Sequence, residues 1–166
     1  KFPIIKKILY EYLNTTDQSG PYHDKDGIIY GGSDNYFVNS LFLNSWNYSM
    51  RTIGTPYISS PVYNTNGQIY TQNNRVSVHH FGLMGSYREL FNYKLMASFS
   101  QNYGMYSNSF AYMKPQTSFY LDVNHTFKKY SDFVVGLSLG VDKGEMYGNS
   151  AGLLISIKKT GELFKY

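Results

Sequence analysis

Long runs of alternating apolar and polar residues fill the second half of the chain and constrain its fold more than any other feature. In residues 91–103, the odd positions are mostly aromatic or aliphatic and the even positions mostly polar. Because successive side chains of a strand point to opposite faces, this run predicts a strand with one apolar and one polar face. Residues 119–129, 133–141 and 151–159 repeat the pattern. A water-soluble sandwich also alternates, but alternation over about ten residues per strand is typical of transmembrane β-barrels.

Two further runs extend this pattern toward the N-terminus. Residues 4–14 predict a first strand, and a helix is the alternative because the period there is poor. The strand places Ile8, Tyr10 and Tyr12 on its apolar face and Lys7, Glu11 and Leu9 on the other. Residues 75–88 predict a second strand, whose alternation breaks near residues 80–82, where a glycine permits a β-bulge.

The lengths of the connections predict an orientation. Outer-membrane barrels have short periplasmic turns and longer extracellular loops. The turns at 89–90 and 130–132 are therefore expected to be periplasmic, and the loops at 105–116 and 142–150 extracellular. The six strands are fewer than the roughly eight of the smallest single-chain barrels, and unpaired edges in lipid cost several kcal/mol per group. We expect an all-β fold in which the chain supplies the C-terminal strands of a larger antiparallel transmembrane β-barrel; the alternative hides two strands in residues 15–74.

Residues 15–74 differ from the rest of the chain in composition and are rich in Gly, Asn, Ser, Asp and Tyr. Asn66–Gly67 is a turn signal that predicts a small hairpin, Asp34 is expected to cap a short helix over residues 36–43, and residues 45–50 predict a short strand. We interpret this tract, called the excursion below, as one long extracellular or lumen-filling loop of a single barrel domain spanning residues 1–166. The chain starts at Lys1, so a mature product or a fragment is expected.

Composition excludes several classes of protein. No stretch approaches the roughly 18 consecutive apolar residues of a membrane helix. The absence of cysteine excludes disulfides and thiolate metal sites. The net charge of +4 comes from scattered Lys and Arg, so no nucleic-acid partner is expected. The 18 tyrosines suit a membrane interface and also a sugar-binding surface, because each has an apolar ring and a polar tip.

The titratable residues do not assemble into a catalytic or metal site. His23, Asp24 and Asp26 lie close in sequence, but the fifth and twelfth positions counted from Asp24 are Ile28 and Asn35, which excludes an EF-hand loop. We expect these three residues to tie their loop together, with ligand contact as the alternative. His79 and His80 are adjacent in a strand and face opposite sides, and His125 lies on the apolar face. No catalytic residue, metal or cofactor is assigned, and the protein is expected not to be an enzyme.

The excursion does hold the residue types that sugar recognition needs. Aromatic rings stack on the apolar side of a sugar, and Asn, Asp and Arg bond its hydroxyl groups. The alternative is that the same residues rigidify the loop. The candidate polysaccharide-binding residues are Tyr22, His23, Asp24, Asp26, Asp34, Asn35, Tyr36, Trp46, Asn47 and Arg51.

One tract resembles a known family. From His23 to Pro56 the chain follows the pattern H-D-x-D-G…G-G-x-D-N-Y-x-x-N…W-x-Y…R-x-I-G-x-P, and residues 73–85 continue it as N-N-R-V-x-x-H-H-x-G-L-x-G. This series resembles the C-terminal part of the capsule assembly Wzi family, in its Bacteroidetes-type branch. The resemblance implies an outer-membrane barrel, in contact with lipid, that binds or organises capsular polysaccharide on the bacterial surface. A structural subunit that contacts other outer-membrane proteins, and a porin-like channel, are the alternative functions.

Overall fold

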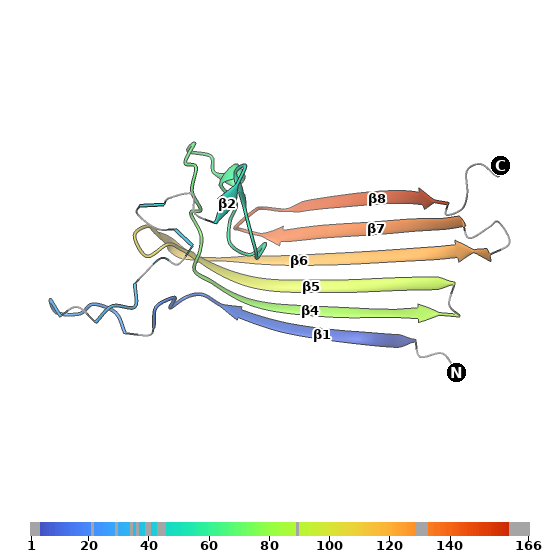
Figure 1. Cartoon of the computed structure of the whole chain (residues 1–166), viewed down its shortest axis with the longest axis horizontal. Coiled ribbons are helices and arrows are strands. Elements are labelled where there is room, and N and C mark those ends of the chain that lie inside the picture. Colours follow the sequence, from blue (N-terminus) through green and yellow to red (C-terminus); the bar gives the residue numbers. More distant parts are fainter. Residues whose placement is uncertain are drawn as a thin grey trace, which may run out of the picture. The chain divides into compact units, whose positions relative to one another are not determined.

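The computed structural model describes residues 4–20, 22–28, 30–33, 35, 37–38, 41–42, 46–88, 90–128 and 133–159. It is all-β, with six long strands in one antiparallel sheet of order β1-β4-β5-β6-β7-β8 (Figure 1). The strands are β1 (Ile5–Asn14), β4 (Val76–Tyr87), β5 (Phe91–Gly104), β6 (Ser109–Phe127), β7 (Phe133–Gly144) and β8 (Ser150–Lys158). The sheet is open, so β1 and β8 are its edges. No helix long and apolar enough to cross a membrane occurs in the described part of the chain.

The chain divides into two compact units. The first comprises Lys1–Glu11, His80–Phe99 and Gln116–Tyr166, and the second comprises Tyr12–His79 and Ser100–Pro115. Strands β1, β4, β5 and β6 contribute residues to both units.

Register in the first unit sorts the side chains by polarity. Leu121 on β6 lies opposite Leu139 on β7, which lies opposite Leu153 on β8. Directly opposed residues share a face of the sheet, so the odd positions of these strands form one apolar face. The neighbouring row pairs Asp122 with Ser138 and belongs to the polar face. The predicted alternation of these strands is therefore confirmed.

Most predicted strands are confirmed, and residues 4–14 form a strand rather than a helix. The predicted loop at 105–116 is wrong, because β6 already begins at Ser109. Pro115 lies inside β6, one residue outside the β6–β7 register that starts at Gln116. There β6 has only β5 as a neighbour, and a strand with an open side tolerates the missing N–H of proline. Strand β7 also runs to Gly144, which shortens the loop predicted at 142–150.

Strand β4 is continuous from Val76 to Tyr87, through the predicted break in alternation near residues 80–82. Val76, Val78 and His80 are all buried, whereas Phe81 is exposed. A Cβ atom on Gly82 would lie 3.2 Å from the Cβ atom of Leu9. The glycine therefore makes room for Leu9 on the neighbouring strand, and the β-bulge permitted there stays a prediction.

The excursion contains β2 (Asn47–Tyr48), β3 (Arg51–Thr52) and the 3₁₀ turn η1 (Pro61–Tyr63). Strands β2 and β3 form their own two-stranded sheet, so neither adds a strand to the large sheet. Ser49 and Met50 connect them with φ angles of 46° and 65°, the left-handed values that a two-residue type I′ hairpin requires.

Other predictions for the connecting segments have mixed outcomes. The hairpin predicted at Asn66–Gly67 is wrong, because residues 64–75 contain no strand to flank the turn. The Asn66 side chain accepts a hydrogen bond from the Gln68 N–H and closes a local turn. The predicted strand at 45–50 shortens to β2, and Ser45 lies outside the described residues. The predicted cap Asp34, much of its helix and the turn at 130–132 also lie outside them. The described residues of that segment, namely 35, 37–38 and 41–42, are in no helix.

Candidate functional site

The C-terminal end of the excursion is held by a buried amide pair. Asn73 is 0% exposed, and its Nδ2 atom donates to Asn102 Oδ1 at 2.9 Å. The Asn73 Oδ1 atom accepts from the backbone N–H of Gly104 at 2.9 Å. Asn102 in turn donates to the carbonyl of Lys114 at 2.9 Å. Every partner in this pair is satisfied, which is what burial of amides requires.

The N-terminal end of the excursion is hydrogen-bonded to the residues at its C-terminal end. Thr15 Oγ1 donates to the Asn74 carbonyl at 2.7 Å and accepts from the Val76 N–H at 2.9 Å. Thr15 N also donates to the Val76 carbonyl at 2.8 Å. These bonds bring the first and last residues of the excursion together, so residues 15–74 form a closed loop.

A cation–π contact reinforces this closure. The Arg75 guanidinium lies 4.5 Å from the centre of the Tyr106 ring, and Arg75 Nε donates to the Thr16 carbonyl at 3.2 Å. The Tyr106 hydroxyl donates to the same carbonyl at 2.7 Å. It also accepts from the Gln18 N–H at 3.1 Å. Arg75 and Tyr106 thus fix the backbone that enters the excursion.

The predicted ligand residues around His23 bond to their own loop. His23 Nε2 lies 2.7 Å from Asp17 Oδ1, and His23 Nδ1 lies 3.2 Å from Ser33 Oγ. The hydrogen bond from His23, followed by that from Thr16, lowers the pKa of Asp17 below its ordinary value of 3.8. Asp24 Oδ1 accepts from the N–H of Tyr30 at 3.0 Å.

The backbone around Asp26 explains the short Asp-Gly sequence. Lys25 and Ile28 exchange two backbone hydrogen bonds, of 3.2 and 3.0 Å. Asp26 and Gly27, with φ angles of 54° and 76°, close this hairpin in the left-handed conformation that Asp-Gly adopts readily. The expectation that residues 23–27 tie their loop together is therefore confirmed. Among the described residues no cluster of three or more His, Asp or Glu side chains is placed to hold a metal ion.

A second group of predicted residues surrounds the β2–β3 hairpin. Trp46 is 40% exposed, and its ring centre lies 6.1 Å from that of Phe37. Asn47 Oδ1 accepts from Thr52 Oγ1 at 2.8 Å. Tyr48 and Arg51 are directly opposed in the hairpin register, so their exposed side chains share one face. Trp46, Tyr48 and Arg51 are called the hairpin surface below.

The remaining candidate polysaccharide-binding residues lie in different environments. Tyr22 is exposed, and Asp34 and Tyr36 lie outside the described residues. Asn35 Oδ1 accepts from Asn74 Nδ2 at 3.2 Å and so helps to anchor the excursion. Sequence reasoning left Tyr48 out of the predicted site. A turn at Ser49–Met50 would have paired it with Arg51, but Ser-Met is not among the Asn-Gly, Asp-Gly and Gly-Gly pairs that type I′ turns prefer.

The apolar face of the sheet carries a row of aromatic rings in the first unit. The ring centre of Phe81 lies 5.1 Å from that of Tyr10 and 6.2 Å from that of Phe99. Phe99 in turn lies 6.0 Å from Phe119, nearly perpendicular to it. These rings come from β1, β4, β5 and β6, and all four side chains are exposed. The apolar face continues through exposed aliphatic residues such as Leu153, which is 65% exposed.

Polar side chains fill the opposite face. Asp122 accepts hydrogen bonds from Ser138 Oγ at 2.6 Å and from Asn124 Nδ2 at 2.7 Å. His80 Nδ1 lies 2.7 Å from Ser98 Oγ, and both side chains are buried.

The histidine predictions are confirmed. His80 is buried on the polar face, whereas the ring of His79 lies on the apolar face, 4.9 Å from that of Tyr12. His125 lies on the apolar face too, with its ring 4.4 Å from that of Phe127.

Burial in the first unit is the reverse of that in a water-soluble domain. Apolar residues normally fill the interior and polar residues the surface. Among the described residues of the first unit, the buried side chains of nonglycine residues are His80, Ser86, Ser98 and Gln116, all polar. The buried apolar residues, Val38, Ile58, Val76, Val78 and Met105, all belong to the second unit.

Comparisons with protein-family models, curated proteins and solved structures gave no match. The resemblance drawn from residues 23–56 and 73–85 therefore stays a prediction.

Proposed function

We propose that this chain contributes six strands to a transmembrane β-barrel of a bacterial outer membrane, in which the excursion binds or organises surface polysaccharide without catalysis. The reversed burial of the first unit carries the proposal. An exposed apolar face costs free energy in water, roughly 25 cal/mol for each square ångström left uncovered. The same face is stable against lipid tails, while the polar face lines a lumen.

The open edges of the sheet agree with a barrel that has further strands. Within lipid, unpaired N–H and C=O groups on β1 and β8 would each cost several kcal/mol. Closure through additional strands, from another segment or another chain, removes both edges. The aromatic row of Tyr10, Phe81, Phe99 and Phe119 suits this environment, because aromatic residues are frequent on the lipid-facing side of such barrels.

The hairpin surface supports the polysaccharide part of the proposal. It combines an exposed indole, an exposed phenol and a guanidinium on a short hairpin whose backbone is fixed. Aromatic rings and a planar donor group are the components that hold a sugar ring and its hydroxyl groups. The residues around His23 are used within their own loop, so the hairpin surface is the stronger of the two predicted groups.

Spin labelling tests the proposed position of the sheet in the membrane. Because the chain has no cysteine, a single introduced cysteine carries the label at one known position. We choose Leu139→Cys on the apolar face and Gly140→Cys on the polar face of β7. A Cβ atom at Gly140 meets nothing within 4 Å, so the control site accepts a side chain. In bilayers, the label at 139 should collide mainly with lipid-dissolved oxygen and the label at 140 mainly with a water-soluble nickel complex. Equal accessibility, or a water-exposed label at 139, would contradict the proposal.

Glycan binding is tested on the whole protein with Trp46→Ala and Arg51→Ala, using a glycan array and retention of capsule on cells. Ile69→Ala is the control, since Ile69 is an exposed apolar residue of the excursion that does not belong to the hairpin surface. Loss of binding in the first two variants alone is expected. Unchanged capsule retention in both would remove the polysaccharide role, and bilayer conductance or stable copurifying proteins would then favour a channel or a structural subunit.

A further inference from the structure

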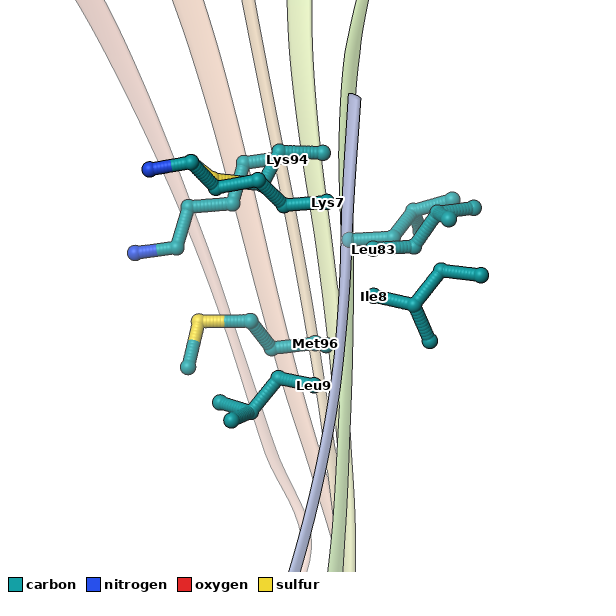
Figure 2. Close-up of a pocket in the computed structure, with 9 residues that line it drawn as sticks. Lys7, Ile8, Leu9, Leu83, Lys94 and Met96 are labelled. Carbon is teal, nitrogen blue, oxygen red and sulfur yellow. The ribbon is translucent and has the colours of Figure 1, made fainter. Parts of the chain in front are cut away.

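Two lysines on the polar face of the first unit line the same two hollows. Lys7 comes from β1 and Lys94 from β5, and their side chains extend in the same direction (Figure 2). Leu9 and Met96 extend to the same side, while Ile8 and Leu83 point to the opposite side. The pair thus belongs to the face that carries Asp122 and Ser138, not to the apolar face.

The two lysines line two adjacent hollows. One, of about 240 Å³, is largely apolar and includes Leu9 and Met96. The other, of about 310 Å³, is lined by Lys6, Lys7, Asn92, Lys94, Asp122 and Asn124 among others. The ammonium groups therefore stand at a boundary, with apolar stems on one side and hydrogen-bonding groups on the other.

The intervening strand contributes a glycine to the first hollow. Strand β4 lies between β1 and β5, and Gly82 on β4 lines this hollow together with Leu9, Lys7 and Lys94.

The charges of this region are unbalanced. Among the described residues, no carboxylate oxygen lies within 4 Å of the ammonium nitrogen of Lys7 or of Lys94. Asp122 is the carboxylate that lines the polar hollow, and its oxygens already accept from Ser138 and Asn124. Lys94 Nζ lies 6.0 Å from the centre of the Tyr120 ring, a weak contact that leaves its three donors available. On this face the ammonium groups of Lys7 and Lys94 thus share one hollow with the single carboxylate of Asp122.

We propose that the Lys7–Lys94 pair binds an oxyanion, either a carboxylate or a phosphate group, in the polar hollow. Two neighbouring ammonium groups repel each other, and a shared oxyanion replaces that repulsion with two charge-assisted hydrogen bonds. Asn92 and Asn124 provide neutral donors beside it. This site is separate from the hairpin surface, and its existence does not depend on glycan binding.

The test follows individual lysines by NMR. The full chain is folded in a maltoside detergent, which carries neither phosphate nor carboxylate, and its lysines are labelled by reductive ¹³C-methylation. Sodium phosphate and sodium acetate are titrated in separate arms at constant ionic strength, with chloride as the balancing anion. The two arms distinguish a phosphate ligand from a carboxylate ligand.

We expect saturable shifts of the Lys7 and Lys94 resonances in at least one arm. Lys7→Gln and Lys94→Gln keep a long polar side chain, so the fold should be retained, and each should weaken binding at the remaining lysine about tenfold, equivalent to about 1.4 kcal/mol. Lys158→Gln is the control, because Lys158 is an exposed lysine at the end of β8. Shifts that stay linear in both arms, that are equal at all lysines, or that persist unchanged in both variants would overturn the proposal.

Discussion

Replacing Asn73 by alanine should destabilise the excursion far more than the same change at an exposed asparagine. Asn73→Ala removes the donor to Asn102 Oδ1 and the acceptor of the Gly104 N–H. Asn102 is 1% exposed and Gly104 is buried, so neither group gains water easily. The variant therefore leaves two buried polar groups without partners.

The magnitude follows from these two groups. A buried donor or acceptor that loses its partner costs about 1–3 kcal/mol, so the variant should lose about 2–6 kcal/mol of unfolding free energy. Asn66→Ala is the matched control, because the Asn66 side chain also makes two hydrogen bonds, accepting from Gln68 N and Gln72 Nε2, but is exposed. Water replaces those bonds, and the expected loss is below about 1 kcal/mol.

The assay is equilibrium unfolding by urea in detergent, followed by tryptophan fluorescence and by circular dichroism. Trp46 is the only tryptophan, and it belongs to the same unit as Asn73, so its fluorescence reports on that unit. A double variant with Asn102→Ala should lose about 1 kcal/mol less than the sum of the single losses, because the two residues share one bond. Equal losses for Asn73→Ala and Asn66→Ala, within about 0.5 kcal/mol, would show that the buried amide pair does not stabilise the excursion.

Three further predictions use the same unfolding assay. Gly104→Ala should lower the unfolding free energy by roughly 3 kcal/mol or more, because the added Cβ would lie 2.8 Å from two backbone atoms at a residue whose φ is 85°. Gly148→Ala is the control: its φ is 79° but the space around it is open, so only the backbone conformation should cost free energy, about 1 kcal/mol. Gly136→Ala should cost about 1–3 kcal/mol because two side-chain oxygens lie within 2.5 Å of the added Cβ, while Gly140→Ala on the same strand should change stability by less than about 0.5 kcal/mol; equal effects would show that the space at residue 136 is not filled. Folding lowers the pKa of Asp17, so its ionised carboxylate stabilises the protein at pH values above the ordinary pKa of 3.8, and this stabilisation is lost as the pH falls below that value. The difference in unfolding free energy between the native chain and Asp17→Asn should therefore shrink below pH 3.8. A difference that stays constant down to about pH 2 would contradict the hydrogen bond from His23.

Local sequence patterns were enough to predict the strands and the faces of the large sheet. Period-two alternation is a local signal, since the side-chain direction of each residue depends only on its own strand. It predicted the six long strands, the opposite orientations of His79 and His80, and the apolar position of His125. The short Asp-Gly turn beside His23 was also predictable as a loop that bonds to itself, because its conformation depends on adjacent residues.

Contacts between residues far apart in the sequence could not be predicted in this way. Asn73 and Asn74 are turn formers by composition, yet both are buried and hold the excursion through partners up to 59 residues away. Pro115 is a loop residue by composition, yet it lies in a strand because the neighbouring strand β7 ends beside it. Lys7 and Lys94 line the same hollow because the strands that carry them, β1 and β5, are separated only by β4. Register and strand order set all three arrangements, and both arise from contacts between segments that no local pattern records.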